Sequence, residues 1–143
     1  MERGEPLFTK EHTWVKVEED DTAIIGLSHV IVEELEEISH IELPEVGIEV
    51  EQMETIATVE GLNDIFDICS PVSGKIIEIN TSLIDEPNLI VEDPYGDGWI
   101  AIIKLSDKEE LSRLMPEEEY REYVNSIMEI EEEYDEEGPE EIY

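Results

Sequence analysis

Hydrophobic and polar positions alternate along much of the first two thirds of the chain, which predicts β-strands. Residues 13–17 alternate around Trp14, and the polar run 18–21 separates them from a second expected strand at 22–27, a pattern typical of a β-hairpin. Further strands are expected at 48–50, 54–59, 65–69, 75–79 and 99–105. The segment from Glu60 to Asp64 contains Gly61 and Asn63, which tolerate positive φ, so we expect a hairpin tip there.

Helical spacing occurs near Ser28 and again near the C-terminus. Ser28 is a candidate N-cap, and the apolar side of the helix that follows would comprise Val30, Ile31, Leu35 and Ile38. Ser106 and Glu109 have capping-box spacing, and Pro116 suits the first turn of a further helix. The apolar stripe of that last helix comprises Tyr120, Tyr123, Val124, Ile127 and Met128. Such a stripe favours core packing, and the whole pattern predicts an all-β fold with peripheral helices.

Charge changes this picture, because 41 of the 143 residues are acidic and only 8 are basic, giving a formal net charge of −33. Such a chain is repelled by nucleic acids and anionic membranes, so we expect neither as a partner. Residues 129–143 hold nine acids and no base, which indicates a solvated acidic tail. We expect residues 1–128 to form one domain, with the β body over about 7–105 and C-terminal helices over about 106–128.

The sequence also indicates the compartment. No apolar run is long enough for a membrane span, no apolar stretch typical of a signal peptide follows Met1, and the single Cys69 cannot form an internal disulfide. These features favour a cytoplasmic protein.

Candidate reactive groups are few. Cys69 has no neighbouring cation in the sequence, and we interpret it as a buried, inert thiol. The three histidines (His12, His29 and His40) are scattered singly, and the acidic runs do not have EF-hand spacing, so no metal site is expected. Without a catalytic constellation or a phosphate loop, the sequence predicts that the protein is not an enzyme.

Four sequence blocks carry a family resemblance. They are Thr-Lys-Glu-His-Thr-Trp-Val at 9–15, Ile-Glu-Leu-Pro-Glu-Val-Gly at 41–47, Ser-Pro-Val-Ser-Gly at 70–74 and Glu-Asp-Pro-Tyr-Gly-Asp-Gly-Trp at 92–99. From about Leu7 to Leu114 the chain resembles the H-protein family of the glycine cleavage system, whose members are lipoyl-domain carriers. The resemblance implies a lipoyl-type barrel-sandwich hybrid with an early inserted helix and C-terminal helices.

The resemblance also implies a specific attachment chemistry. In the family, a lysine at a hairpin tip forms an amide with lipoic acid, and the resulting arm carries an aminomethyl group and then a dithiol between enzymes. The family motif at the tip reads Glu-Ser-Val-Lys-Ala and is followed several residues later by Pro-Val-Ser-Gly. Alignment backwards from Pro71 without gaps places this motif on Glu60, Gly61, Leu62, Asn63 and Asp64.

Asn63 therefore occupies the lysine position, and its amide has no nucleophilic amine that could be acylated. No lysine lies between Lys16 and Lys75, so a small error in register does not supply one. Gly61 and Asp64 also depart from the motif, which argues against a change confined to the lysine. We expect no lipoate on this chain, and no other cofactor.

These observations favour an H-protein-like binding or regulatory module that acts by protein–protein contact. Its expected partners are proteins that dock H proteins or lipoyl domains, namely glycine cleavage enzymes or lipoate-attaching enzymes. One alternative is a functional carrier, either with a misassigned attachment site or with Cys69 as its thiol. A third interpretation is an acidic scaffold for a basic protein.

Overall fold

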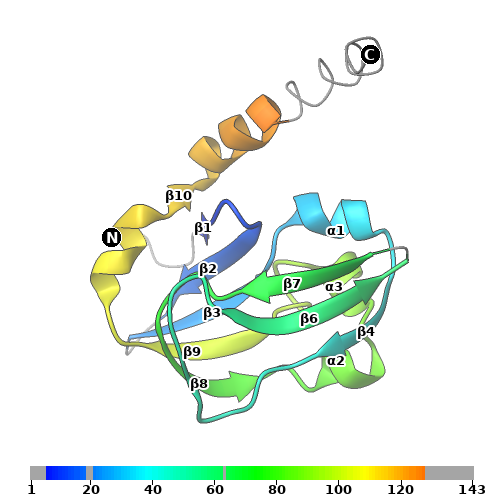
Figure 1. Cartoon of the computed structure of the whole chain (residues 1–143), viewed down its shortest axis with the longest axis horizontal. Helices are drawn as coiled ribbons and strands as arrows, with labels where there is room; N and C mark the ends of the chain where they lie inside the picture. Colours follow the sequence, from blue (N-terminus) through cyan, green and yellow to red (C-terminus); the bar gives the residue numbers. More distant parts are fainter. Residues whose placement is uncertain (1–5, 19–20, 63, 128–143) are drawn as a thin grey trace, which may run out of the picture.

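The computed structural model describes residues 6–18, 21–62 and 64–127, which form two β-sheets with short helices around them (Figure 1). The strands are β1 (Leu7–Phe8), β2 (Thr13–Val17), β3 (Thr22–Leu27), β4 (Ile38–Glu42), β5 (Glu49–Val50), β6 (Thr55–Gly61), β7 (Ile65–Cys69), β8 (Gly74–Ile79), β9 (Ala101–Leu105) and β10 (Met115–Pro116). The helices are α1 (His29–Leu35), α2 (Ser82–Asp85), α3 (Leu89–Glu92), the 3₁₀ helix η1 (Lys108–Arg113) and a C-terminal helix over 117–127.

The larger sheet has the strand order β10-β1-β2-β3-β9-β8-β5, and the smaller has the order β4-β6-β7. The neighbouring strands of both sheets pair antiparallel, including the predicted hairpin of β2 and β3, in which Val15 lies opposite Ile25. The two sheets enclose the main core and are not joined into a closed barrel (Figure 1). The predicted all-β fold with peripheral helices is therefore confirmed.

The main core forms where inward-facing strand positions meet, because alternate residues of a strand point to the same face. Val15, Ile25, Val59, Ile76 and Ile103 are all at most 1% exposed and belong to one contiguous apolar cluster. The sequence alternation that predicted the strands is thus the alternation that fills the space between the sheets.

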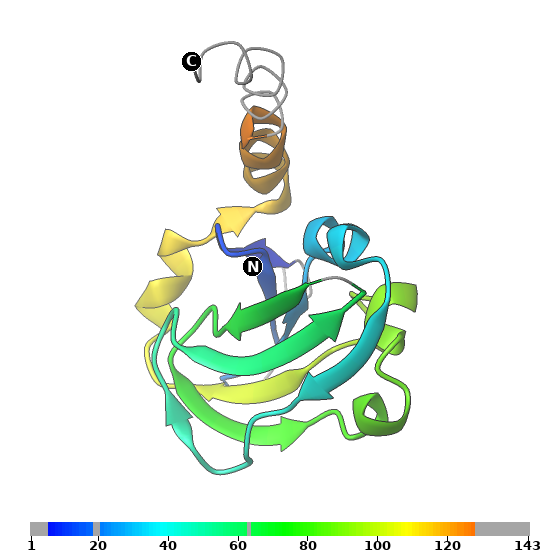
Figure 2. The same ribbon diagram turned by 45° about the vertical axis from the view of Figure 1, so that its right-hand side comes forward.

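A second, smaller core attaches the C-terminal helix to the larger sheet. Tyr120 of this helix stacks on Phe8, with ring centroids 4.4 Å apart, and both side chains are 2% exposed. Trp14, Met115 and Val124 complete the buried part of the cluster. The apolar stripe predicted for this helix does pack as core at Tyr120 and Val124, whereas Met128 lies outside the described residues. Figure 2 shows the helix over 117–127 extending away from the two sheets.

Several predicted helix boundaries are wrong. Helix α1 ends at Leu35, and Ile38 begins strand β4 instead of continuing the helix. Glu36 has a positive φ of 66°, which stops helical propagation before Ile38 is reached. Ser28 occupies the N-cap position without a capping hydrogen bond, because its hydroxyl pairs with Tyr120 instead, 2.7 Å away.

The predicted caps near the C-terminus also differ from the structure. Asp107, not Ser106, caps the helix η1, and its carboxylate accepts a hydrogen bond from the backbone N–H of Glu109. Pro116 lies in strand β10, and the helix begins one residue later. The proposed acidic tail, 129–143, lies outside the described residues. Within the described part of the chain, no helix is long and apolar enough to cross a membrane.

Candidate functional site

The predicted hairpin tip joins β6 to β7 in the smaller sheet. The two strands pair antiparallel, with Glu60 opposite Ile65, and the backbone N–H of Gly61 donates to the carbonyl of Asp64 at 2.7 Å. Leu62 is 56% exposed, and Ile65 is 69% exposed. Asn63 itself lies outside the described residues. The structure therefore confirms a hairpin around this position.

Position 61 suits a glycine for a reason that only the structure shows. The φ of Gly61 is not positive, so the glycine does not serve here to supply a left-handed turn conformation. Instead, the tip packs against the end of helix α1, where the N–H of Leu62 donates to the carbonyl of Leu35. A Cβ at position 61 would lie 2.8 Å from Cδ2 of Leu35 and 3.2 Å from its carbonyl oxygen. A side chain at position 61 would require Leu35 or the backbone beside it to shift.

Cys69 lies at the far end of β7 from the tip. The sequence predicted a buried thiol, but the side chain is only partly buried. Burial raises the pKa of the Cys69 thiol, and the charges of Glu11 and Asp67 raise it further, against a hydrogen bond with Thr55 that lowers it. The thiolate, which is the reactive form, is therefore disfavoured. This arrangement does not favour a thiol carrier.

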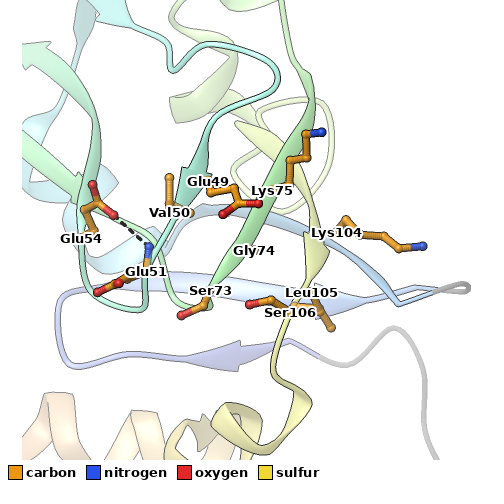
Figure 3. Close-up of a pocket in the computed structure, with 10 residues that line it drawn as sticks. All are labelled: Glu49, Val50, Glu51, Glu54, Ser73, Gly74, Lys75, Lys104, Leu105 and Ser106. Atoms are coloured by element: carbon orange, nitrogen blue, oxygen red, sulfur yellow. Dashed lines mark hydrogen bonds between the residues drawn. The ribbon is translucent and has the colours of Figure 1, made fainter.

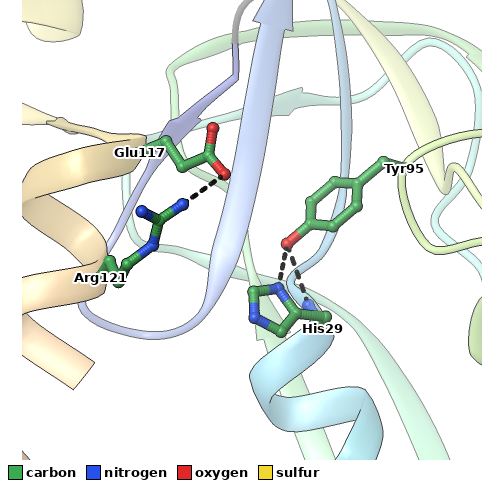
Figure 4. A network of polar contacts seen from close by, with 4 residues as sticks. All are labelled: His29, Tyr95, Glu117 and Arg121. Carbon is green, nitrogen blue, oxygen red and sulfur yellow. Dashed lines mark hydrogen bonds and ion pairs between the residues drawn. The ribbon is translucent and has the colours of Figure 1, made fainter. Parts of the chain in front are cut away.

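The histidines take part in separate contacts. Nδ1 of His12 lies 2.8 Å from the hydroxyl of Tyr120, and burial lowers the pKa of His12 despite the charges of Glu11 and Glu34. His29 pairs with the hydroxyl of Tyr95 through both its backbone N–H and its Nδ1 (Figure 4). His40 is exposed on β4. Among the described residues, no cluster of three or more potential ligands could hold a metal ion.

The hydroxyl of Tyr120 is held by two partners. It lies 2.7 Å from the hydroxyl of Ser28 and 2.8 Å from Nδ1 of His12. Burial raises the pKa of Tyr120 to about 12, although the hydrogen bond with Ser28 opposes this rise. These bonds connect the C-terminal helix to the start of α1 and to the turn between β1 and β2. A cavity of about 520 Å³ lies alongside, lined in part by His29, Val124 and Arg121.

A second cavity, of about 760 Å³, lies where β5, β8 and β9 meet (Figure 3). Lys75 and Lys104 are directly opposite each other on adjacent strands. Within the turn that lines one part of the cavity, the carboxylate of Glu54 accepts a hydrogen bond from the backbone N–H of Glu51. Sequence analysis did not identify this cavity, because its residues come from distant parts of the chain.

Comparison with known proteins matches residues 7–127 to the family described as glycine cleavage H-protein. The chain belongs to the glycine cleavage H-protein family. It is 44% identical over 117 residues to the glycine cleavage system H protein of Coprothermobacter proteolyticus, covering 82% of this chain and 92% of the relative. It is 45% identical over 121 residues to a probable glycine cleavage system H protein of Pyrococcus abyssi, covering 84% and 90%.

A solved structure gives the same assignment. The glycine cleavage system H protein of Mycobacterium marinum superposes with a TM-score of 0.77 and 30% sequence identity, covering 85% of this chain and 98% of that one. The predicted resemblance and the barrel-sandwich fold are therefore confirmed. H proteins are carriers and not enzymes; the family carries lipoate and interacts with the glycine cleavage enzymes.

Proposed function

We propose that this H-protein family member is a non-lipoylated binding or regulatory module that acts through protein–protein contact and catalyses no reaction. The observation that carries the proposal is Asn63 at the position of the family's lipoyl-lysine, in a segment without any lysine between Lys16 and Lys75. An amide side chain cannot form the amide bond that anchors lipoate. We propose a cytoplasmic location for the same module.

The packing of the tip supports this proposal. The family motif has a serine where this chain has Gly61, and the space at Gly61 is filled by Leu35. The departure at Asn63 therefore accompanies a tip whose backbone lies closer to α1 than a side chain at position 61 would allow. This agrees with a hairpin that is retained as a structural surface after the arm is lost.

The proposed partners are proteins that dock H proteins or lipoyl domains, either glycine cleavage enzymes or enzymes that attach lipoate. The chain keeps the family fold over 7–127, so surfaces that depend on the fold can be kept without the arm. Binding without an arm would let the module occupy a docking surface that a lipoylated H protein also uses.

Intact mass spectrometry tests this proposal. The chain is coexpressed with a lipoate ligase and lipoate, beside a lysine-bearing H protein as the positive control. We expect the control to gain one lipoyl group and this chain to keep its unmodified mass. A lipoyl adduct on any lysine of this chain would overturn the proposal in favour of a working carrier.

Binding is tested separately from modification. The unmodified chain is titrated into a complex of a lipoylated H protein with the glycine-cleaving decarboxylase or with a lipoate ligase. We expect it to displace the labelled H protein from at least one of these enzymes. Failure to compete with either enzyme would remove these partners from the proposal.

A further inference from the structure

Strand β7 provides the longest uncovered sheet edge in the described chain. The smaller sheet ends in β4 and β7, and the larger ends in β5 and β10, each of which has only two residues. Strand β4 also has five residues, but the backbone N–H of Ile38 at its start donates to the side chain of Asn88. In contrast, the described residues supply the five residues of β7 with no backbone hydrogen-bond partner beyond those of β6. In both Figures 1 and 2, β7 forms the margin of its sheet.

The register of the hairpin shows which backbone groups face this edge. Gly61 and Asp64 form a hydrogen-bonded pair next to the tip. Because antiparallel ladders alternate between bonded and non-bonded pairs, the pair of Glu60 with Ile65 and the pair of Thr58 with Asp67 are non-bonded. The backbone N–H and C=O groups of Ile65 and Asp67 therefore point away from β6, towards the open edge.

The side chains of β7 give this edge a definite chemistry. Ile65 and Asp67 are exposed on the outer face, whereas Phe66 is partly buried and Ile68 is 1% exposed on the inner face. At the Cys69 end of the strand, burial raises the pKa of the thiol, and the negative charges of Glu11 and Asp67 raise it further. The sequence from 17 to 74, which contains Asp67 and the whole smaller sheet, has no lysine or arginine.

We infer that the edge of β7 binds an extended segment of a partner protein as an added β-strand, and that this segment alternates basic and apolar side chains. Main-chain hydrogen bonds to Ile65 and Asp67 would hold the segment. Basic side chains would extend over the outer face beside Asp67, with their aliphatic stems covering Ile65. Apolar side chains would pack beside Phe66. This inference rests on the proposed function and specifies its mode of contact.

A second copy of this chain is a poor occupant of the same edge. Pairing of two β7 strands would bring acidic outer faces together, and like charges across a strand pair are destabilising. Each chain also carries a formal net charge of −33, which opposes self-association. Both effects favour a basic partner segment.

A capped heptapeptide of alternating lysine and valine tests the inference, with binding to the full chain measured by fluorescence anisotropy. Two matched peptides carry N-methyl groups, one on all lysines and the other on all valines. They have the same charge and side chains, but each lacks the N–H groups along one edge. Strand addition predicts that one methylated peptide loses affinity about tenfold or more while the other binds as the parent does. Equal binding by all three peptides, or no binding by the parent in low salt, would overturn the inference.

Variants of Asp67 test the same edge from the side of the protein. Asp67→Pro removes a backbone N–H that faces the open edge, and proline is tolerated at such edge positions. Asp67→Ala loses the same charge and keeps the N–H, so it is the matched control. We expect Asp67→Pro to bind the parent peptide about tenfold more weakly than Asp67→Ala. Equal binding by the two variants, with thermal melting showing both folded, would contradict strand addition.

These outcomes are separate from those of the proposed function. The peptide experiment uses neither lipoate nor a glycine cleavage enzyme, so a lipoyl adduct elsewhere on the chain would leave its result unchanged. Conversely, loss of the strand-addition signature would leave the mass and competition experiments as they stand. If Asp67→Pro fails to fold, the two methylated peptides with the unchanged protein still decide the inference.

Discussion

At the scale of single residues, the glycine at position 61 allows the hairpin tip to pack closely against Leu35. The ideal Cβ of any larger residue there would lie 3.0 Å from Cβ of Leu35, closer than ordinary van der Waals contact. Leu35 is only 4% exposed, so it has little space into which to move. The shape of the tip is therefore linked to the end of α1.

This coupling predicts the behaviour of variants that restore the family motif. Asn63→Lys supplies the missing amine but leaves Gly61 and Asp64 in place, so we expect a lipoate ligase to modify it much less completely than a lysine-bearing H protein. Adding Asp64→Ala restores one flank without a clash and should raise the modified fraction. Adding Gly61→Ser would also strain the contact with Leu35 and lower the melting temperature.

Intact mass after a fixed time of ligation measures the modified fraction, and thermal melting measures the strain. The lysine-bearing H protein is the control for ligase activity. Complete modification of Asn63→Lys alone, at the rate of that control, would show that the residues flanking position 63 do not matter.

Cys69 gives a second prediction at the residue scale. Because burial and nearby acids raise its pKa, the thiolate fraction at pH 8 is smaller than that of a free cysteine. We expect slow labelling by an iodoacetamide probe at pH 8, with a rate that keeps rising above pH 9, and fast labelling after unfolding in urea. Rapid stoichiometric labelling of the folded chain at pH 7 would instead support a thiol carrier.

At the scale of secondary-structure elements, local pattern predicted strands better than helices. The ranges expected for β2, β3 and β7 match the structure, because short apolar runs bounded by turn residues mark buried strands. The end of α1 was missed because Ile38 continues its helical spacing but pairs in a sheet, opposite Gly61. Strand pairing across such a distance in the chain is invisible to a local pattern.

Only part of the candidate site could likewise be predicted from local sequence pattern. The hairpin that joins β6 to β7 followed from the turn residues around position 63. The close approach of Gly61 to Leu35 did not, since it depends on how α1 packs against the tip. Likewise, Ser28 was a reasonable cap by its type, but its hydroxyl bonds to Tyr120, ninety-two positions away in the sequence.

Tyr120 allows a test of how the C-terminal helix is held. Tyr120→Phe keeps the stacking on Phe8 but leaves the side chains of Ser28 and His12 without this partner. We expect a loss of about 1–3 kcal/mol in the free energy of unfolding, measured by urea denaturation. Tyr123→Phe, on the same helix but only partly buried, is the control and should change stability by about 0.5 kcal/mol or less. Equal effects of the two substitutions would show that the network does not hold the helix.

At the scale of the whole molecule, charge is distributed unevenly. The sequence from 17 to 74, which includes α1 and the entire smaller sheet, contains no lysine or arginine. All the lysine and arginine side chains that the structure describes lie elsewhere, such as Lys75 and Lys104 on the larger sheet. The segment that forms α1 and the smaller sheet therefore carries acids without a lysine or arginine of its own, which suits both solubility and the attraction of a basic partner.

The salt dependence of the melting temperature measures the repulsion among the acids. The Debye length falls from about 10 Å at 0.1 M to about 3 Å at 1 M ionic strength, so added sodium chloride should relieve repulsion among the acids. We expect the melting temperature to rise by about 5 °C or more over this range. Deleting residues 129–143 removes nine of the 41 acids and no base, and it leaves every residue of the family match in place.

The deletion should therefore raise the melting temperature in low salt and leave it nearly unchanged in 1 M salt, because repulsion from the tail is already screened there. Differential scanning calorimetry of both chains at the two salt concentrations measures the four values. The matched control is deletion of the same residues in a chain whose nine tail acids are replaced by glutamine, which should have no effect at either concentration. A lower melting temperature for the truncated chain in 1 M salt would mean that residues 129–143 stabilise the fold by contacts other than charge, and the domain would then have to include them.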